Sequence, residues 1–139
     1  MNGIKYASFF ESINENTPLI EYSKYIELNA KFKDPFHEVE GLQNIFRIFL
    51  SMYKKLDEPK FKIKEVVENK NIAYIKWTFT FKFKKENKVQ SFDGVSRVVF
   101  NSNDKMILHE DYWDAASNLY EKIPVISLLM RFLKRKMND

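Results

Sequence analysis

The sequence predicts a single α+β domain, in which helices pack against a curved, mixed, mostly antiparallel β-sheet. Two observations predict this class. Apolar residues recur at helical spacing in segments 6–13 and 42–56, and at every second position in segment 75–84. Turn-forming residues divide the stretch after Pro59 into several strand-like segments. A chain of 139 residues also has the length of one domain.

Two helices are expected at the start of the chain. The first follows the apolar residues of 6–13 and should end at the polar residues 14–16. Thr17 has the residue type of an N-cap, and Pro18 suits the first position of a helix because its φ is already helical. We therefore expect a short second helix at about 18–25.

The strand that follows ends at Asp34. Asp34 shares a face with Ala30 and Phe32, because side chains alternate along a strand, and Pro35 favours an extended conformation at Asp34. We therefore expect the carboxylate to point into the fold, where apolar surroundings would raise its pKa and suit it to act as a general base. The alternative is that Asp34 only caps the following turn, since Asp-Pro is common in turns. The residues alone leave both alternatives open.

A longer helix and a four-stranded meander come next. Gly41 precedes a single apolar stripe over 42–56, and Pro59 follows its end. Four strands are then expected, of which the second has the clearest alternation and the third contains Gly94 as a candidate β-bulge. Their expected ranges are about 61–67, 75–84, 88–100 and 105–113.

The residue pattern in the last part of the chain predicts an amphipathic, basic helix at about 115–137, interrupted at Pro124. Its apolar side would pack on the sheet or form a dimer contact, and its basic residues are favoured near a helix C-terminus by the helix dipole. The alternative is contact with a membrane surface or a partner. We favour packing or a dimer contact. The apolar side holds Ile126, Leu129, Met130, Leu133 and Met137, and the basic residues are Arg131, Lys134, Arg135 and Lys136.

Composition limits the classes of function. The chain has no cysteine, which excludes disulfides and cysteine nucleophiles. Its net charge of +4 is modest, and its basic residues are mostly spread-out lysines, so we expect no nucleic-acid partner. The first residues lack the apolar region of a signal peptide, and no run approaches the roughly 20 apolar residues that cross a bilayer. These observations predict a cytoplasmic protein.

The element order and two local motifs resemble the nuclear transport factor 2-like (NTF2-like) superfamily, also called SnoaL-like or ketosteroid-isomerase-like. The first motif is Lys33–Phe36, with Asp-Pro at a strand end, followed by Gly41 and a helix. The second is Tyr112-Trp113 at the end of the last strand. In isomerases of this superfamily the matching Asp is the base and the matching Trp faces the pocket. The resemblance covers nearly the whole chain and implies a cone, in which a curved sheet surrounds an apolar pocket that helices close.

The resemblance also implies which residues line the pocket. If Trp113 faces inward, then so do His109 and Asp111, four and two positions earlier. With Asp34 they form a candidate catalytic set, because environments that push pKa values apart create an acid and a base. The alternative is that His109 and Asp111 are a buried structural pair. The other expected pocket residues are Phe10, Phe32, His37, Trp77, Phe79, Ser96 and Trp113, with His37 near the mouth.

Departures from the isomerase pattern argue against a standard ketosteroid isomerase. The positions of the isomerases' two oxyanion donors, a Tyr and a protonated acid, hold Phe10 and Ser96 here. Losing one such donor lowers the rate about a hundredfold to a thousandfold. Arg97 is expected on the face opposite Ser96, so the Asp-Arg-Asp arrangement of the fold's epoxide hydrolases is not matched. His109 with Asp111 loosely resembles the pocket groups of its polyketide cyclases.

These observations lead to two functional hypotheses. The first is a small-pocket enzyme that acts on an apolar carbonyl-type molecule by general acid–base chemistry, as an isomerase, cyclase or lyase, with Asp34 as the base. The second is a non-catalytic module that binds a lipophilic ligand or mediates assembly, as many members of the superfamily do. We expect no cofactor, and no HxH or HExxH spacing indicates a metal site. A homodimer is the expected assembly.

Overall fold

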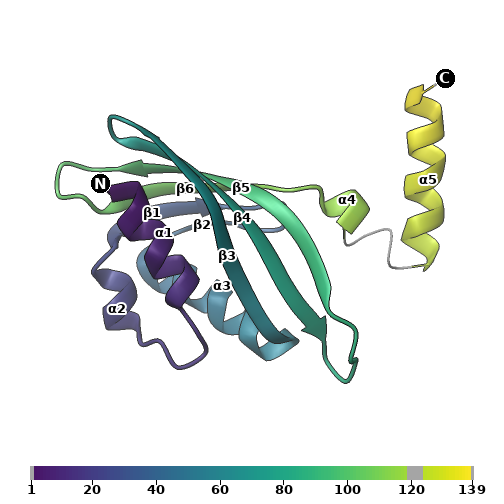
Figure 1. Cartoon of the computed structure of the whole chain (residues 1–139), viewed down its shortest axis with the longest axis horizontal. Coiled ribbons are helices and arrows are strands. Elements are labelled where there is room, and N and C mark those ends of the chain that lie inside the picture. The colour runs from purple at the N-terminus through teal and green to yellow at the C-terminus, as the bar shows by residue number, and fades with distance from the viewer. Residues whose placement is uncertain (1, 119–123, 139) are drawn as a thin grey trace.

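The computed structural model of the protein describes residues 2–118 and 124–138, and it shows helices lying against one face of a six-stranded sheet (Figure 1). This arrangement confirms the predicted α+β class. The elements in chain order are α1 (Asn2–Ser12), α2 (Leu19–Ser23), β1 (Ile26–Lys33), β2 (Glu38–Glu40), α3 (Leu42–Lys55), β3 (Leu56–Asn69), β4 (Ile72–Phe83), β5 (Gln90–Phe100), β6 (Met106–Tyr112), α4 (Ala115–Asn118) and α5 (Pro124–Asn138).

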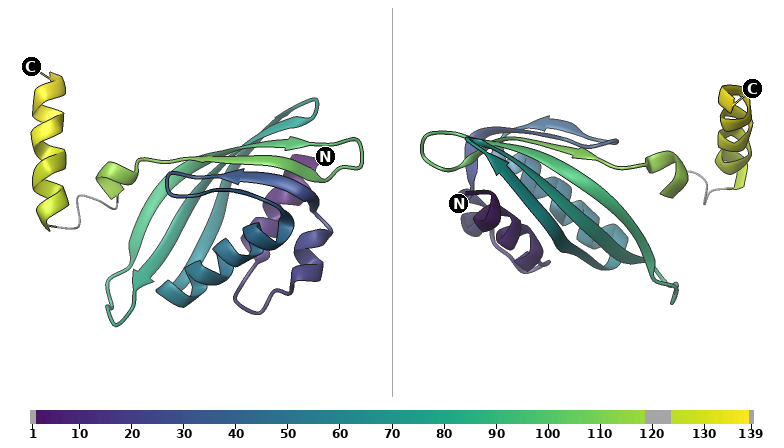
Figure 2. Two further views of the ribbon diagram at one scale, coloured as in Figure 1. Left: turned by 180° about the vertical axis from the view of Figure 1, so that it is seen from behind. Right: turned by 45° about the horizontal axis from the view of Figure 1, so that its top comes forward.

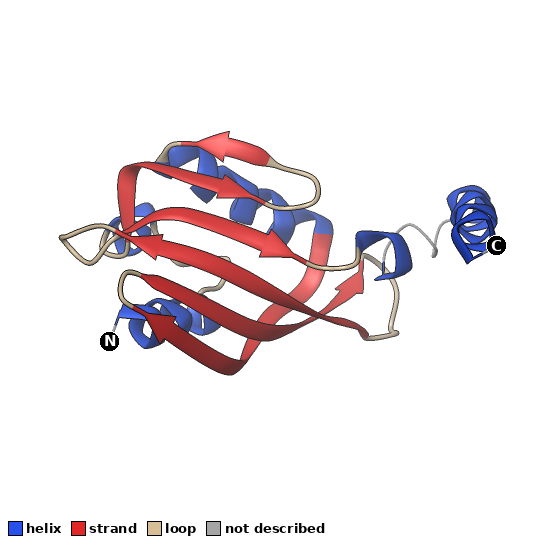
Figure 3. Cartoon of the chain, turned by 90° about the horizontal axis from the view of Figure 1, so that it is seen from above, coloured by secondary structure: helices blue, strands red, loops and turns tan. Residues whose placement is uncertain are grey.

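The sheet is mixed and open, with the strand order β2-β1-β6-β5-β4-β3 (Figure 3). Strands β3 to β6 form the predicted antiparallel meander, since short turns join them. The short edge strand β2, antiparallel to β1, was not predicted. β1 pairs with β6 in parallel, and Lys33 lies opposite Glu110. This pairing brings the residues that follow β1 and the last residues of β6 to the same end of the sheet.

A register shift in β3 decides which of its side chains face the core. The predicted alternation holds through Phe61 and Ile63, but the pairing with β4 shifts between Ile63 and Glu65. An extra residue at a β-bulge reverses the faces of the residues that follow it. As a result Val66 packs against the core, whereas Val67, which an uninterrupted alternation would place on the same face as Ile63, is 55% exposed.

Gly94 does not form the β-bulge predicted for it, since the pairing of β5 with β4 is continuous there. Gly94 instead leaves room for a ring. It lies directly opposite Trp77 on β4, and a Cβ atom at this position would come within 2.3 Å of the indole. The missing side chain therefore allows the ring of Trp77 to lie against β5.

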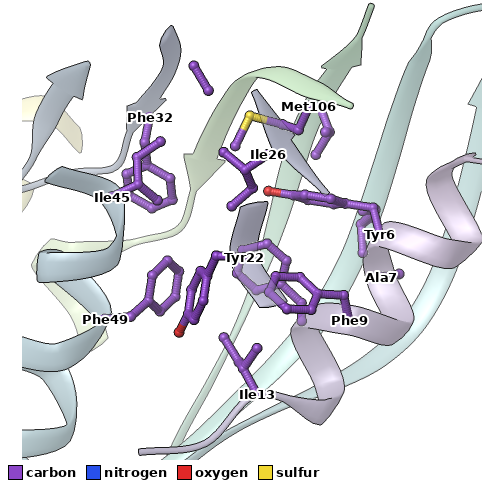
Figure 4. Packing of buried hydrophobic residues seen from close by; sticks show 14 of the residues in the cluster. Tyr6, Ala7, Phe9, Ile13, Tyr22, Ile26, Phe32, Ile45, Phe49 and Met106 are labelled. Carbon is purple, nitrogen blue, oxygen red and sulfur yellow. The ribbon is translucent and has the colours of Figure 1, made fainter. Parts of the chain in front are cut away.

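Helices α1 and α3 lie on the same side of the sheet and enclose the core with it (Figures 1 and 2). Both are amphipathic, and their apolar sides are buried. Figure 4 shows Tyr6 and Phe9 of α1 pointing toward Ile45 and Phe49 of α3, with Tyr22 between them. Phe9 meets Tyr22 edge-to-face at 5.2 Å. The interior between the helices and the sheet is thus packed with aromatic rings.

The start of α2 differs from the prediction. Pro18 is the N-cap and the helix begins at Leu19. Oγ1 of Thr17 accepts a hydrogen bond of 3.0 Å from the backbone N–H of Asn14. Thr17 therefore stabilises the turn between α1 and α2 rather than the first turn of α2.

The last two helices leave the sheet at the end of β6. The helix expected at about 115–137 is described as two parts, α4 and α5, and α5 begins at Pro124. α5 stands beyond the end of the sheet (Figures 1 and 2). A hydrogen bond of 3.1 Å from Nζ of Lys134 to Oγ of Ser117 joins it to α4. The packing of this helix on the sheet, expected from the sequence, is therefore not observed among the described residues.

Candidate functional site

A chain of hydrogen bonds crosses the otherwise apolar interior and joins five side chains from α1, β4, β5 and β6. The hydroxyl oxygen of Tyr6 lies 2.8 Å from Nδ1 of His109, and Nε2 of His109 lies 2.6 Å from Oδ1 of Asp111. The hydroxyl of Ser96 donates to the same carboxylate oxygen at 2.5 Å, and Nε1 of Trp77 donates to Ser96 at 2.8 Å. His109 and Ser96 are only 2% and 3% exposed, so bulk water does not compete for these bonds. We call this set the buried chain.

The chemistry of these groups fixes the direction of the protons. The indole N–H of Trp77 can only donate, so Ser96 is left to give its own proton to Asp111. An ionised Asp111 can only accept, so Nε2 of His109 carries a proton, and Nδ1 of the neutral imidazole accepts the proton of Tyr6. Burial raises the pKa of Tyr6 well above its usual value, and the negative charge of Asp111 raises it further. Tyr6 therefore remains a donor over the physiological pH range.

Strand register brings the polar groups of the buried chain together. Ser96 on β5 lies opposite Asp111 on β6. His109 shares a face with Asp111 because it is two residues earlier on the same strand. Trp77 on β4 lies two residues from the partner of Ser96, a diagonal that a long side chain can cross. Tyr6 on α1 contacts Nδ1, the ring nitrogen of His109 that does not face Asp111. The buried chain therefore links the helix layer to the sheet.

A small cavity lies beside the buried chain. Its volume is about 10 Å³, close to the space that one water molecule needs. Phe10 closes part of this space, with its ring centre 5.0 Å from that of His109. The apolar pocket that the family resemblance implies is therefore almost filled by side chains in this structure. The residues that line the cavity are Phe10, Phe61, Ile63, Ile75, Trp77, Ser96, His109 and Asp111.

Asp34 does not belong to the buried chain. β1 ends at Lys33, so Asp34 has already left the alternation that would point it inward. Its Oδ1 accepts hydrogen bonds from the backbone N–H groups of Phe36 at 2.8 Å and His37 at 2.7 Å. Nδ1 of His37 lies 3.0 Å from both carboxylate oxygens. The structure thus shows the turn-capping aspartate that was the alternative interpretation of the sequence, and it corrects the expectation that the carboxylate points into the fold.

Asp34 lines a surface concavity of about 540 Å³ at the shared end of β1 and β6. Trp113 faces this concavity and not the inner cavity, contrary to the prediction, because its ring stacks on Phe92 at a centroid distance of 4.4 Å. Asp111 lines both spaces, and its side chain is 13% exposed. Asp111 is therefore where the buried chain approaches the surface. The concavity is lined by Lys33, Asp34, Pro35, Glu110, Asp111, Tyr112, Trp113 and Asp114.

A broader groove of about 1060 Å³ lies between the end of α1, the start of β3 and the turn after β4. Several of its charges are paired with one another. Lys84 lies 2.8 Å from Asp57, and Lys82 lies 3.2 Å from Glu58. The buried chain does not line this groove, so we do not place the acid–base site there.

Besides Trp113, three predicted pocket residues lie outside the cavity. Phe32 packs on the imidazole of His109 with ring centres 4.9 Å apart, so it is a wall of the site. Phe79 lies farther along β4, where its ring contacts Phe61 at 4.6 Å. His37 belongs to the surface turn after β1, and its side chain is 43% exposed. Within residues 2–118 and 124–138, no cluster of three or more His, Cys, Asp or Glu side chains is arranged to hold a metal ion.

Sequence reasoning missed Tyr6. The available signal was a tyrosine on the apolar side of the first helix, one turn before Phe10, since residues four apart lie on one helix face. A hydroxyl on such a face needs a partner, and His109 supplies it. Ser96 lines the cavity, as predicted for a pocket residue, but its hydrogen bond to Asp111 was not foreseen.

The model of the SnoaL-like domain family matches residues 8–109 of this chain. An NTF2-like protein of unknown function from Burkholderia pseudomallei has the same fold, with a TM-score of 0.72 and 11% identity over 84% of this chain and 94% of that chain. A putative SnoaL-like polyketide cyclase from Jannaschia has a TM-score of 0.73 and 8% identity over 84% and 87% of the two chains. A protein from Catenulispora acidiphila with a ketosteroid isomerase-like fold, in complex with trimethylamine, has a TM-score of 0.71 and 11% identity over 85% and 88%. No curated protein matches the chain in sequence.

Proposed function

The chain belongs to the SnoaL-like domain family, and we propose that it is a general acid–base enzyme that acts on a small, apolar carbonyl compound with Asp111 as the proton acceptor. The reaction class is isomerisation, cyclisation or elimination next to a carbonyl group. The polyketide cyclase name of the Jannaschia neighbour is in keeping with this class. The buried chain is the observation that carries the proposal.

The hydrogen bonds of the buried chain converge on one oxygen of Asp111. Both Ser96 and His109 contact Oδ1, and no described residue donates a hydrogen bond to Oδ2. A carboxylate held through one oxygen keeps its other oxygen oriented toward a substrate, which is the preorganisation that catalysis requires. In this proposal Oδ2 takes a proton from the carbon beside the carbonyl group and later returns it.

His109 and Tyr6 are positioning residues in this proposal. Asp111 fixes the tautomer of His109 by accepting from Nε2, and Tyr6 occupies Nδ1. The raised pKa of Tyr6 means that this residue, at one end of the buried chain, stays neutral.

Rings form the apolar walls of the proposed substrate site. Phe10, Phe61 and Trp77 line the cavity beside Asp111. Phe61 comes from the edge strand β3 and packs edge-on against Trp77 at 5.3 Å, while it stays partly exposed. We propose that an outward rotation of this ring admits the substrate, because an edge strand has no neighbour on its outer side. An apolar compound would replace the contacts that the ring gives up.

The filled cavity favours a second candidate, a non-catalytic module that binds a lipophilic ligand or mediates assembly. A space of about 10 Å³ excludes any organic ligand from the closed conformation. Both nitrogens of His109 are also engaged within the protein. In this second candidate the buried chain has the structural task of fixing one arrangement of the core.

Deuterium exchange of the α-protons of cyclohexanone, followed by NMR, separates the two candidates. The enzyme hypothesis predicts exchange faster than in buffer, lowered about a hundredfold or more in Asp111→Asn. Asp34→Asn is the matched control, because it removes a carboxylate that also lines the surface concavity but lies outside the buried chain. Equal rates for the wild type and Asp111→Asn would contradict the assignment of the base. Binding of the ketone without any exchange would support the non-catalytic module.

A further inference from the structure

We propose that α5 binds the surface of an anionic lipid bilayer, with its apolar side in the headgroup region and its basic side toward the lipid phosphates. This inference is independent of the chemistry proposed for Asp111. It rests on the residue pattern of α5, on the distribution of charge in the chain and on the place of the helix in the fold.

The residue pattern of α5 gives it two distinct sides. At 100° per residue, the apolar residues occupy an arc of about 200°, and the opposite arc is polar and basic. A wide apolar arc beside a basic arc is typical of helices that lie in the plane of a membrane interface. The apolar arc contains Val125, Ile126, Leu128, Leu129, Met130, Phe132, Leu133 and Met137, with Lys136 as the one charged residue inside it, and the polar arc contains Ser127, Arg131, Lys134, Arg135 and Asn138.

Most of the net charge of the protein comes from this helix. Residues 124–139 contain four basic residues and one acidic residue, a net charge of +3, whereas the whole chain carries +4. The other 123 residues are therefore almost neutral. Such a charge asymmetry indicates an anionic partner for the helix. Anionic phospholipids fit both arcs, because their phosphates match the cations and their acyl chains match the apolar residues.

The apolar side chains of α5 that the structure describes, in residues 131–138, lie outside the core. The helix stands beyond the end of the sheet in two views of the molecule (Figures 1 and 2). Phe132 and Leu133 are 48% and 45% exposed, and Met137 is 86% exposed. Nζ of Lys134 donates a hydrogen bond to Oγ of Ser117, next to α4's last residue. Hydrogen bonds from Ser117 lower the pKa of Asp114, and the charge of Lys134 lowers it further. The polar arc therefore faces α4 in part. Burial of these three side chains, Phe132, Leu133 and Met137, therefore requires an external surface.

A lipid surface explains these observations better than a second copy of the chain. A partner protein would need an acidic, apolar groove, and the body of this chain is nearly neutral. The helix also cannot cross a bilayer: its 15 residues span about 22 Å, and among the described residues no helix is long and apolar enough to do so. The helix thus lies on the membrane in this proposal.

Cosedimentation of the full chain with lipid vesicles tests the proposal. We expect the protein to bind vesicles of phosphatidylcholine with 25% phosphatidylglycerol, and to bind vesicles of pure phosphatidylcholine at least tenfold more weakly. A triple variant of the basic arc, Arg131→Gln with Lys134→Gln and Arg135→Gln, should weaken binding to anionic vesicles about a hundredfold. A double variant of the apolar arc, Phe132→Ser with Leu133→Ser, should weaken it by a comparable factor.

The matched control removes the same charge from another surface. Lys60, Lys62 and Lys64 are exposed on the edge strand β3, and their replacement by Gln changes the net charge by the same three units. This control should bind within about threefold of the wild type. Three outcomes would overturn the proposal: no difference between the two vesicle types, equal weakening by the control, or a dimer in sedimentation velocity that both α5 variants dissociate while vesicle binding is absent.

Discussion

Nε2 of His109 lies 2.6 Å from Oδ1 of Asp111, and this contact joins a fully buried imidazole to a carboxylate that lines both the inner cavity and the surface concavity. Removing one partner of such a buried pair is costly, because the remaining partner stays buried away from water. The first prediction concerns Ser96, which donates to the same carboxylate, and the second concerns the ring of Trp77, which donates to Ser96.

Ser96→Ala should destabilise the protein by about 1–3 kcal/mol, since it leaves the indole N–H of Trp77 buried without its acceptor and removes one donor from Asp111. Chemical denaturation at neutral pH measures the change. Thr78→Ala is the matched control, because it removes a hydroxyl that bonds to Asp93 on the exposed face of the same sheet, and it should change the stability by less than about 1 kcal/mol. Equal losses in the two variants would show that Ser96 has no special role.

Gly94→Ala should destabilise the protein by about 1–3 kcal/mol or more, because the new methyl group would lie 2.3 Å from the ring of Trp77. The near-UV circular dichroism of Trp77 should change with it. Trp77→Phe removes the outer ring atoms that meet the methyl group. A double-mutant cycle should therefore give a smaller cost of Gly94→Ala in the Trp77→Phe background, and additive costs would contradict the contact.

Stability should fall at alkaline pH in a way that depends on Tyr6. The pKa of Tyr6 is raised in the folded state, whereas an unfolded chain loses a tyrosine proton near pH ~10. Above that pH the unfolded state binds fewer protons, so the free energy of unfolding decreases, on the order of 1 kcal/mol per pH unit for each such tyrosine. Burial also raises the pKa of Tyr22, and it raises the pKa of Tyr53 to about 12, so these two contribute to the same slope.

Urea denaturation at pH 9, 10 and 11 checks this prediction. Tyr6→Phe should be less stable than the wild type at pH 9, because it loses the hydrogen bond to His109, and should then lose stability with a shallower slope. Tyr112→Phe, at a site that is 58% exposed, should keep the wild-type slope. An unchanged slope in Tyr6→Phe would mean that Tyr6 ionises alike in both states.

Asp34→Asn should destabilise the protein by about 1–2 kcal/mol, because a charged oxygen that accepts two backbone N–H bonds is replaced by a neutral one. Asp34→Ala, which removes the acceptor altogether, should lose more. Thermal unfolding at neutral pH compares the two. Equal or higher stability of Asp34→Asn would indicate a carboxylate held without partners, and would restore Asp34 as a candidate base.

Much of the fold could be predicted because local sequence and tertiary structure agree. The alternation of Trp77, Phe79 and Phe81 with polar residues places this strand with one face on the core, and all three are buried. The bulge in β3 could not be predicted, since the inserted residue leaves the pattern of residue types almost unchanged. The parallel pairing of β1 with β6 was not predicted, because it depends on contacts between residues far apart in the sequence.

The site was predictable in part for the same reason. His109 and Asp111 follow from strand alternation, because they are two residues apart. Asp34 did not follow from it, since the strand ends one residue earlier and the side chain bonds to the turn. Tyr6 depends on how α1 is docked over β6, and no local pattern contains that information.

The closed interior has a thermodynamic effect on any ligand that enters it. Because the cavity has only about 10 Å³, a ligand larger than water would need a conformer in which a lining ring, such as that of Phe10 or Phe61, has moved outward. The apparent dissociation constant is then the intrinsic constant divided by the population of that conformer, so an open population of about 1% weakens binding about a hundredfold. Phe10→Ala would enlarge this population and lower the stability of the protein, so the same ring sets ligand affinity and stability in opposite directions.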